Sequence, residues 1–340
     1  MTERARARWG TALRLLPGLL ALALFTTILD VDLLRAAFAQ PAARGWLALG
    51  VVTYAVSHLA GGLAWRGLVA TPERPVRMTE VLRLDLGSGF WSTVLPGAVA
   101  GELIKGVRLA GRGHEPVRVA HGLLVGRLCS VGMASVLGGL GAWATPALGG
   151  EVRAAAMSAF AGLLGAAAGA LGMVLLGPRA LGRLAWRARW LGVEGESPDG
   201  QVGLAALRAG ARDTTRKVLA ALVAAPPPSV GRLARSALAA GTMHALLGGM
   251  YVCVFKAAGA AIPLPTGMAL SSLSAIAESL PISVGGYGVR ELVVTALATP
   301  VVGAAPATVA ALALSVPVTT MLVAGGLVEA VQSLRSRASR

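Results

Sequence analysis

The sequence predicts an all-α polytopic membrane protein with about six full transmembrane helices and two re-entrant helical hairpins. The chain is 55% hydrophobic and only 14% charged. Its mean hydropathy of +0.68 is far above that of a soluble globular domain. Several apolar runs reach the length of about 20 residues that a bilayer-crossing helix needs. Two further segments are only weakly apolar and combine a Leu-Pro pair with several glycines, which is typical of interrupted membrane helices.

The first half of the chain, residues 1–177, contains four of the apolar runs and one weakly apolar segment. Arginines before the first run place the N-terminus in the cytoplasm by the positive-inside rule, and Asp30 and Asp32 favour an uncleaved first helix over a signal peptide. The weakly apolar segment has basic residues on both flanks, so it is expected to enter and leave the membrane on the same side. The expected full helices are about 12–29, 46–66, 119–145 and 154–177, with the hairpin at about 80–104.

A basic connector, residues 178–235, is expected to lie in the cytoplasm. Arg179, Arg183 and Arg187 recur at helical spacing with apolar residues opposite, which is the pattern of a helix on the membrane surface. A solvated connector is an equally good interpretation.

The second half, residues 236–340, is expected to hold full helices at about 236–256 and 307–330. Arginines beyond the last helix place the C-terminus in the cytoplasm, so the hairpin at about 265–300 must enter from the outer face. Two hairpins that enter from opposite faces, one in each half, predict an inverted-topology repeat, in which interrupted helices build a site near the midplane.

The net charge of +15 would suggest nucleic acid as a partner of a soluble protein. Here the arginines lie in short connections, which instead indicates an anionic lipid surface on the cytoplasmic side, and nucleic-acid binding is not expected. Cys129 and Cys253 lie singly in apolar runs, so no disulfide, metal site or cofactor is expected. The sequence leaves open whether the chain forms a homo-oligomer.

The two glycine-rich tips indicate a polar cavity, because non-helical backbone at membrane depth must be buried in protein or face water. A kinked, closely packed helix is the alternative. The backbone residues expected to form the tips are Pro96, Gly97 and Gly101 in the first hairpin, and Pro281, Gly285, Gly286 and Gly288 in the second.

Ionisable residues inside the spans are the candidate substrate-binding groups, because a charge at the bilayer centre costs about 2.5–3.5 kcal/mol. Arg290 and Glu291 are adjacent and should not share a helix face, so each is expected to pair across the two hairpins. The expected pairs are Glu102 with Arg290, or Glu291 with Lys105 or Arg127. Lys105 and Arg290 could instead extend to an interface. The full candidate set is Glu102, Lys105, Arg127, Arg290 and Glu291, with the hydroxyls of Ser92 and Ser283 as headgroup ligands.

Three stretches resemble the transmembrane region of lysylphosphatidylglycerol synthases and the wider flippase-like family around it. They are FWSTVLPG at residues 90–97 followed by GE at 101–102 and KGVR at 105–108, GRL at residues 126–128, and LPISVGGYGVRE at residues 280–291. The resemblance extends from about residue 10 to 330. It implies movement of aminoacylated phospholipids or other polar lipids between leaflets. No soluble synthase domain is recognised in these residues, so the identity of the lipid is not carried over.

The leading hypothesis is therefore a lipid flippase or transporter that moves a polar, anionic or aminoacylated phospholipid, or a polyprenyl-linked lipid, across the cytoplasmic membrane. The sequence has no Gly-x-x-x-x-Gly-Lys-Ser/Thr motif for ATP. An ion or lipid gradient would then supply the energy, with protonation of Glu102 or Glu291 as the coupling step. One alternative is a membrane enzyme that acts on a lipid phosphate, as a phosphatase or transferase. The other is a non-transporting accessory subunit of envelope synthesis.

Overall fold

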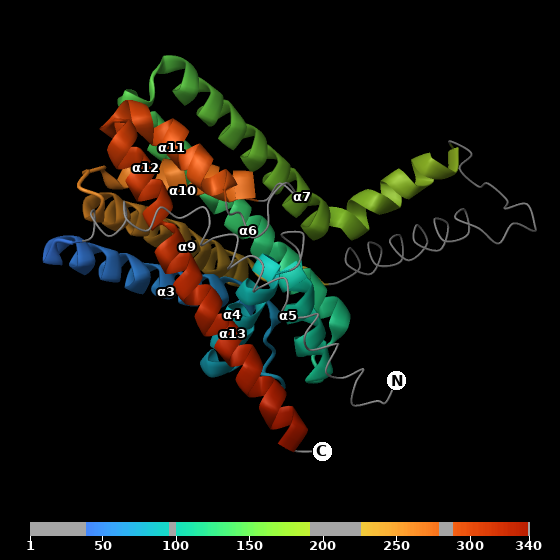
Figure 1. Ribbon diagram of the computed structural model, residues 1–340. Coiled ribbons are helices and arrows are strands. Elements are labelled where there is room, and N and C mark those ends of the chain that lie inside the picture. Colours follow the sequence, from blue (N-terminus) through green and yellow to red (C-terminus); the bar gives the residue numbers. More distant parts are fainter. Residues whose placement is uncertain (1–38, 95–99, 191–225, 279–287, 339–340) are drawn as a thin grey trace, which may run out of the picture.

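The computed structural model describes residues 39–94, 100–190, 226–278 and 288–338, and within these ranges every regular element is a helix (Figure 1). The helices are α3 (Pro41–Val69), α4 (Met78–Val94), α5 (Ala100–Gly111), α6 (Pro116–Trp143), a short 3-10 turn (Pro146–Leu148), α7 (Gly150–Trp190), α9 (Val230–Ala257), α10 (Leu264–Glu278), α11 (Val289–Val302), α12 (Ala304–Ala313) and α13 (Ser315–Ala338).

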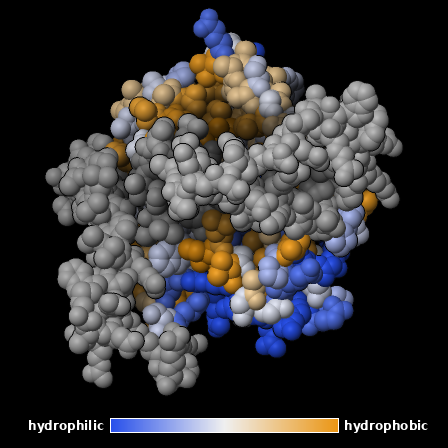
Figure 2. Space-filling view, turned by 90° about the vertical axis from the view of Figure 1, so that its right-hand side faces the viewer, coloured by the Kyte–Doolittle hydropathy of each residue, from blue (hydrophilic) through white to orange (hydrophobic). Residues whose placement is uncertain are grey.

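Five helical stretches are long and apolar enough to cross a membrane, namely α3, α6, Gly150–Leu175 of α7, α9, and Ala304–Leu334 through α12 and α13. These stretches confirm the predicted all-α multi-pass class. The predicted first helix, about 12–29, lies outside the described residues. Figure 2 shows an apolar region on one face of the molecule, with hydrophilic residues gathered below it at the lower end. That division is expected for a protein whose middle faces lipid and whose end faces water.

The last predicted helix, about 307–330, is not continuous as expected but consists of α12 and α13, which are separated at Leu314. Pro317 explains the break, because its ring has no N–H to bond the carbonyl of Ala313 and would collide with that carbonyl in a straight helix. The break places the hydroxyl of Ser315, which is buried, beside the residues of α11.

Each predicted hairpin corresponds to two helices that pack against each other, α4 with α5 and α10 with α11. Figure 1 shows the first pair near the lower end of the bundle and the second pair near the upper end. The tips, residues 95–99 and 279–287, lie outside the described residues, so re-entry into the membrane stays a prediction. The second arm of the first hairpin continues to Gly111, beyond the predicted end at about 104.

The predicted connector, residues 178–235, begins as a helix, because α7 continues to Trp190. Figure 1 shows that α7 changes direction along its length. Residues 191–225 lie outside the described residues. Whether the helical part lies on a membrane surface therefore stays a prediction.

The core is built where α9 packs between α3 and α10. Its largest cluster contains the fully buried side chains of Phe255, Leu270 and Leu314. Glycine permits the closest approach: a Cβ on Gly267 of α10 would lie 2.4 Å from the carbonyl oxygen of Gly248 on α9. Helix–helix contact through small residues is the usual way for membrane helices to gain packing, since lipid provides no hydrophobic drive between them.

Replacing Gly267 by valine is expected to lower the melting temperature of the detergent-solubilised protein, because overpacking a close contact costs about 1–3 kcal/mol. The matched control is Gly165→Val on α7, where a Cβ meets nothing within 4 Å. Thermal unfolding followed by circular dichroism measures both variants. Equal melting temperatures for the two would contradict the described α9–α10 contact.

Candidate functional site

The first hairpin contains a buried lysine that is paired with two carboxylates. Lys105 on α5 is only 3% exposed. Its Nζ lies 2.7 Å from Oδ1 of Asp85 on α4 and 3.2 Å from Oε1 of Glu102 on α5. A buried charge is tolerated only when it is paired and hydrogen-bonded, and Lys105 meets both conditions. We call Asp85, Glu102 and Lys105 the first charge cluster.

Trp65 of α3 contacts two members of the first charge cluster. Its indole Nε1 donates a hydrogen bond of 3.0 Å to Oδ1 of Asp85, and its ring centroid lies 5.0 Å from the ammonium of Lys105. The ring therefore adds a cation–π contact to the ion pairs. Gly101 allows α5 to approach this closely, since a Cβ there would lie 2.4 Å from the carbonyl oxygen of Ser88 on α4.

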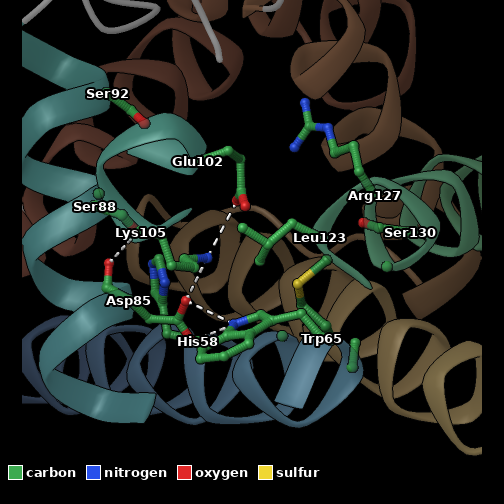
Figure 3. Close-up of a pocket in the computed structure, with 15 residues that line it drawn as sticks. His58, Trp65, Asp85, Ser88, Ser92, Glu102, Lys105, Leu123, Arg127 and Ser130 are labelled. Atoms are coloured by element: carbon green, nitrogen blue, oxygen red, sulfur yellow. Dashed lines mark hydrogen bonds and ion pairs between the residues drawn. The ribbon is translucent and has the colours of Figure 1, made fainter. Parts of the chain in front are cut away.

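A cavity of about 230 Å³ opens above the first charge cluster, between α3, α4, α5 and α6 (Figure 3). Glu102 and Lys105 line one side, with Ser92 of α4 above them, and Arg127 and Ser130 of α6 line the opposite side. The structure thus brings Ser92, Glu102, Lys105 and Arg127 of the candidate set to one cavity.

Arg127 differs from the other charged residues of this cavity because no carboxylate pairs with it anywhere in the described part of the chain. Its side chain is exposed, and it lies near the middle of the 28-residue helix α6. In Figure 3 its guanidinium extends toward the cavity from the side opposite Glu102.

One turn after Arg127 on α6, Ser130 forms a hydrogen bond with His244 of α9, in which Oγ of Ser130 and Nε2 of His244 are 3.0 Å apart. The other ring nitrogen of His244 is buried and has no hydrogen-bond partner among the described residues. A serine–histidine pair can activate the serine as a nucleophile, but a third group normally orients the histidine. No such group is seen within the ranges that the structure covers.

The second hairpin contains its own buried cluster, which we call the second charge cluster: Glu278, Arg290, Glu291 and Ser315. Arg290 is 3% exposed. Its Nη2 lies 2.7 Å from Oε1 of Glu291, and its Nη1 lies 3.8 Å from Oε1 of Glu278. Ser315 donates a hydrogen bond of 2.9 Å to the same Oε1 of Glu291.

The expectation that Arg290 and Glu291 cannot pair with each other is wrong. Both residues lie in the first turn of α11, where Glu291 reaches back to accept a hydrogen bond of 2.7 Å from the backbone N–H of Gly288. The carboxylate therefore lies beside the start of the helix, where the long side chain of Arg290 reaches it. Gly288 precedes the helix with a φ of +83°, a conformation that favours glycine.

The predicted ion pairs between the hairpins are also wrong. Glu102 pairs with Lys105, and Glu291 pairs with Arg290, so each hairpin neutralises its own buried cation. The two pairs of arms lie toward different ends of the bundle in Figure 1, which explains why these side chains do not meet. Six further candidates lie outside the described residues: Pro96, Gly97, Pro281, Ser283, Gly285 and Gly286.

A third ionic contact joins the first hairpin to the last helix. Arg108 of α5 binds the carboxylate of Glu329 on α13 through two hydrogen bonds, of 2.6 Å from Nη1 and 2.5 Å from Nη2. Trp91 of α4 donates a further hydrogen bond of 3.0 Å to Oε2. Bidentate arginine–carboxylate pairs combine energy with geometric specificity. Gly87 leaves room for this contact, since its Cβ would lie 2.2 Å from Oε1 of Glu329.

Asp85, Glu329 and Trp65 are not among the predicted site residues. Asp85 carried a usable signal, because an aspartate inside a weakly apolar span needs a cation and Lys105 lies in the other arm of the same hairpin. Glu329 could have been noticed as the one carboxylate of α13. Nothing in the sequence indicates the role of Trp65. Within the described ranges, no group of three or more His, Cys, Asp or Glu side chains is placed to hold a metal ion.

The fold and these clusters define a multi-pass α-helical membrane protein that carries paired charges between its helices. The chain belongs to the family described as the lysylphosphatidylglycerol synthase TM region, whose model matches residues 11–326. This match covers nearly the whole chain and agrees with the resemblance in the three sequence stretches. No individual curated protein matches the chain significantly.

Proposed function

We propose that the protein moves a polar lipid with an anionic headgroup between the leaflets of the cytoplasmic membrane. The observation that carries this proposal is Arg127, an arginine at membrane depth that faces a polar cavity without a carboxylate partner among the described residues. Family membership supports a role in lipid metabolism or lipid movement. The other charged groups of the cavity are already paired with one another.

The two sides of the cavity carry opposite charges, which favours a headgroup that contains both a phosphate and an amine. Asp85 and Glu102 both contact Lys105, so the first charge cluster has a net negative charge that faces the positive Arg127 across the cavity. A headgroup phosphate would pair with Arg127, because guanidinium matches phosphate in a bidentate geometry. An amine on the same headgroup would face Glu102. A zwitterionic or aminoacylated lipid therefore fits both sides.

The size of the cavity fits a headgroup rather than a whole lipid. A volume of about 230 Å³ has no room for two acyl chains. The chains would stay in the bilayer while the headgroup crosses along the polar groups of the protein.

The packing of the two halves supports the inverted repeat that this proposal includes. Helix α4 of the first half packs against α13 of the second, and α10 of the second half packs against α6 of the first. Two equivalent halves related by a pseudo-twofold axis produce such a reciprocal exchange. In this arrangement both termini lie in the cytoplasm, and movement of α6 relative to the body formed by α4, α5 and α13 would expose the cavity to each leaflet in turn.

Replacing Arg127 by glutamine is expected to lower lipid exchange between leaflets by about tenfold or more, since a charge-assisted hydrogen bond contributes about 1.5–3 kcal/mol. Proteoliposomes with fluorescent lipids of several headgroups, scored by chemical quenching of the outer leaflet, measure the rate. Arg127→Lys should retain part of it, because it keeps the charge but not the fork geometry.

The matched control is Arg83→Gln on α4, which removes an exposed arginine that does not line this cavity. It should exchange lipid at the wild-type rate. Exchange by the wild type no faster than in protein-free liposomes, for every headgroup tested, would refute the flippase proposal. Equal rates for wild type and Arg127→Gln would remove Arg127 from it.

A second candidate function, an enzyme acting on a lipid ester or phosphate, rests on the hydrogen bond between Ser130 and His244 at the wall of the same cavity. It predicts release of a lipid fragment in the same proteoliposomes, abolished by Ser130→Ala. Exchange of intact lipid by Ser130→Ala at the wild-type rate would favour transport.

A further inference from the structure

A second cavity, separate from the one above, lies where two membrane helices begin. Its volume is about 660 Å³, and it is lined by the first turns of α6 and α9 together with the Pro226–Pro227–Pro228 segment. Its polar lining groups are Glu115, Arg118 and His121 from the start of α6, and Ser229 and Arg232 from the start of α9. None of the sequence predictions included this site.

Both helix starts lack a side-chain cap, and α6 leaves backbone donors open at the cavity. The N-cap residues, Glu115 and Ser229, make no side-chain capping hydrogen bond. The first N–H groups of a helix have no partner inside it, and the helix dipole adds about half a positive charge at this end. Val117 and Arg118, in the first turn of α6, line the cavity, whereas the backbone N–H of Arg232 in α9 already donates a hydrogen bond of 2.9 Å to the carbonyl oxygen of Ser229. The start of α6 is therefore the favourable environment for an anion.

His121 provides an independent indication of a ligand. Its side chain is 5% exposed, and its Nε2 has no hydrogen-bond partner among the described residues. A buried polar atom without a partner costs about 1–3 kcal/mol, and this one belongs to a residue that lines the cavity. An imidazole with its proton on Nε2 would donate a hydrogen bond to an anionic oxygen there.

The charges of the lining agree with an anionic ligand. Arg118 and Arg232 are half-buried and form no ion pair within the part of the chain that the structure describes. Glu115 is exposed and is the one carboxylate of the lining. Apolar groups, including Leu68 and Val125, line the remainder. A cavity with cations, open N–H groups and an apolar wall matches a phosphate that is attached to a lipid glycerol.

We propose that this cavity binds a phosphate group, presented by an anionic phospholipid or as free phosphate, between the N-termini of α6 and α9. Arg118, Arg232, Nε2 of His121 and the backbone N–H groups of the first turn of α6 are its ligands. The positive-inside rule places both helix starts on the cytoplasmic side, where anionic phospholipid headgroups are abundant. The proposal does not depend on the function of the Arg127 cavity.

The test measures binding to the full chain in the Arg127→Gln background, so that the central cavity contributes no phosphate ligand of its own. Native mass spectrometry from an uncharged detergent counts retained lipid after titration with phosphatidylglycerol or with diacylglycerol, which lacks the phosphate. Inorganic phosphate is titrated separately by calorimetry. Three variants are compared in this background: the double substitution Arg118→Gln/Arg232→Gln, the single substitution His121→Phe, and the single substitution Glu115→Gln. The control is Arg235→Gln, which removes an exposed arginine near Arg232 on α9 that does not line the cavity.

Phosphatidylglycerol should bind, and the double arginine variant should bind it at least about tenfold more weakly, while Arg235→Gln matches the parent. His121→Phe should weaken binding, and Glu115→Gln should strengthen it. Phosphatidylglycerol bound far more tightly than inorganic phosphate identifies a lipid site, and similar affinities identify a free-phosphate site. Equal retention of diacylglycerol and phosphatidylglycerol, or unchanged binding by the double arginine variant in a monodisperse preparation, would overturn the proposal.

Discussion

Lys105→Met is expected to be among the most destabilising single substitutions in the chain. It removes the cation that holds Asp85 and Glu102, and it leaves Asp85 as a nearly buried, uncompensated carboxylate with a side chain that is 11% exposed. Breaking a buried ion pair by removing one partner costs about 3–5 kcal/mol. Thermal unfolding in detergent should therefore show a large loss of melting temperature, and the yield of folded protein should fall.

The double variant Asp85→Asn with Lys105→Met separates lost charge pairing from lost packing. It removes both members of the shortest pair in the first charge cluster, so it should recover much of the melting temperature. Glu102→Gln should have a smaller effect than Lys105→Met, because its side chain is 34% exposed and water can solvate the groups left behind. Equal melting temperatures for wild type and Lys105→Met would show that this cluster does not stabilise the fold.

Arg290→Met is expected to have a comparable effect in the second half of the chain. The substitution leaves Glu291, 13% exposed, without its cation, and it also unpairs Glu278. Loss of about 3–5 kcal/mol is again the expected cost of a buried carboxylate without a partner. The same thermal unfolding measurement applies.

Two milder substitutions rank the contacts of Arg290. Ser315→Ala removes one hydrogen bond to the Glu291 carboxylate and should cost about 1.5–3 kcal/mol, the usual contribution of a hydrogen bond to a charged group. Glu278→Gln should cost less than Arg290→Met, because the Glu278 carboxylate is 33% exposed and lies 3.8 Å from the guanidinium. A melting temperature for Glu278→Gln below that of Arg290→Met would assign the main pairing to Glu278 instead of Glu291.

The fold class could be predicted from hydropathy and charge bias because a helix in lipid must be long, apolar and internally hydrogen-bonded. The predicted bounds of about 46–66 and 236–256 fall inside α3 and α9 for this reason. The break in the last helix was not predicted, although Pro317 is visible in the sequence. A hydropathy average does not detect such a break, because the helical segments on both sides of it are apolar.

The sequence predicts which charged residues belong to the site better than it predicts which of them pair with each other. The cost of a charge in lipid selects Glu102, Lys105, Arg127, Arg290 and Glu291 whatever the packing. Partner choice depends on distances between helices and on side-chain direction, which hydropathy and charge bias do not determine. The pairing of Arg290 with its neighbour Glu291 arises from the geometry of the first turn of α11, and the N-terminal cavity at α6 and α9 arises from two helix starts far apart in the chain.

The contact of Arg108 with Glu329 limits which parts of the molecule can move independently. Separating α5 from α13 would break two charge-assisted hydrogen bonds and the bond from Trp91, and would leave both ions without a partner. The first hairpin and the last helix should therefore move as one rigid body, even though they come from opposite halves of the chain. A hinge that opens the Arg127 cavity has to lie on its other side, toward α6.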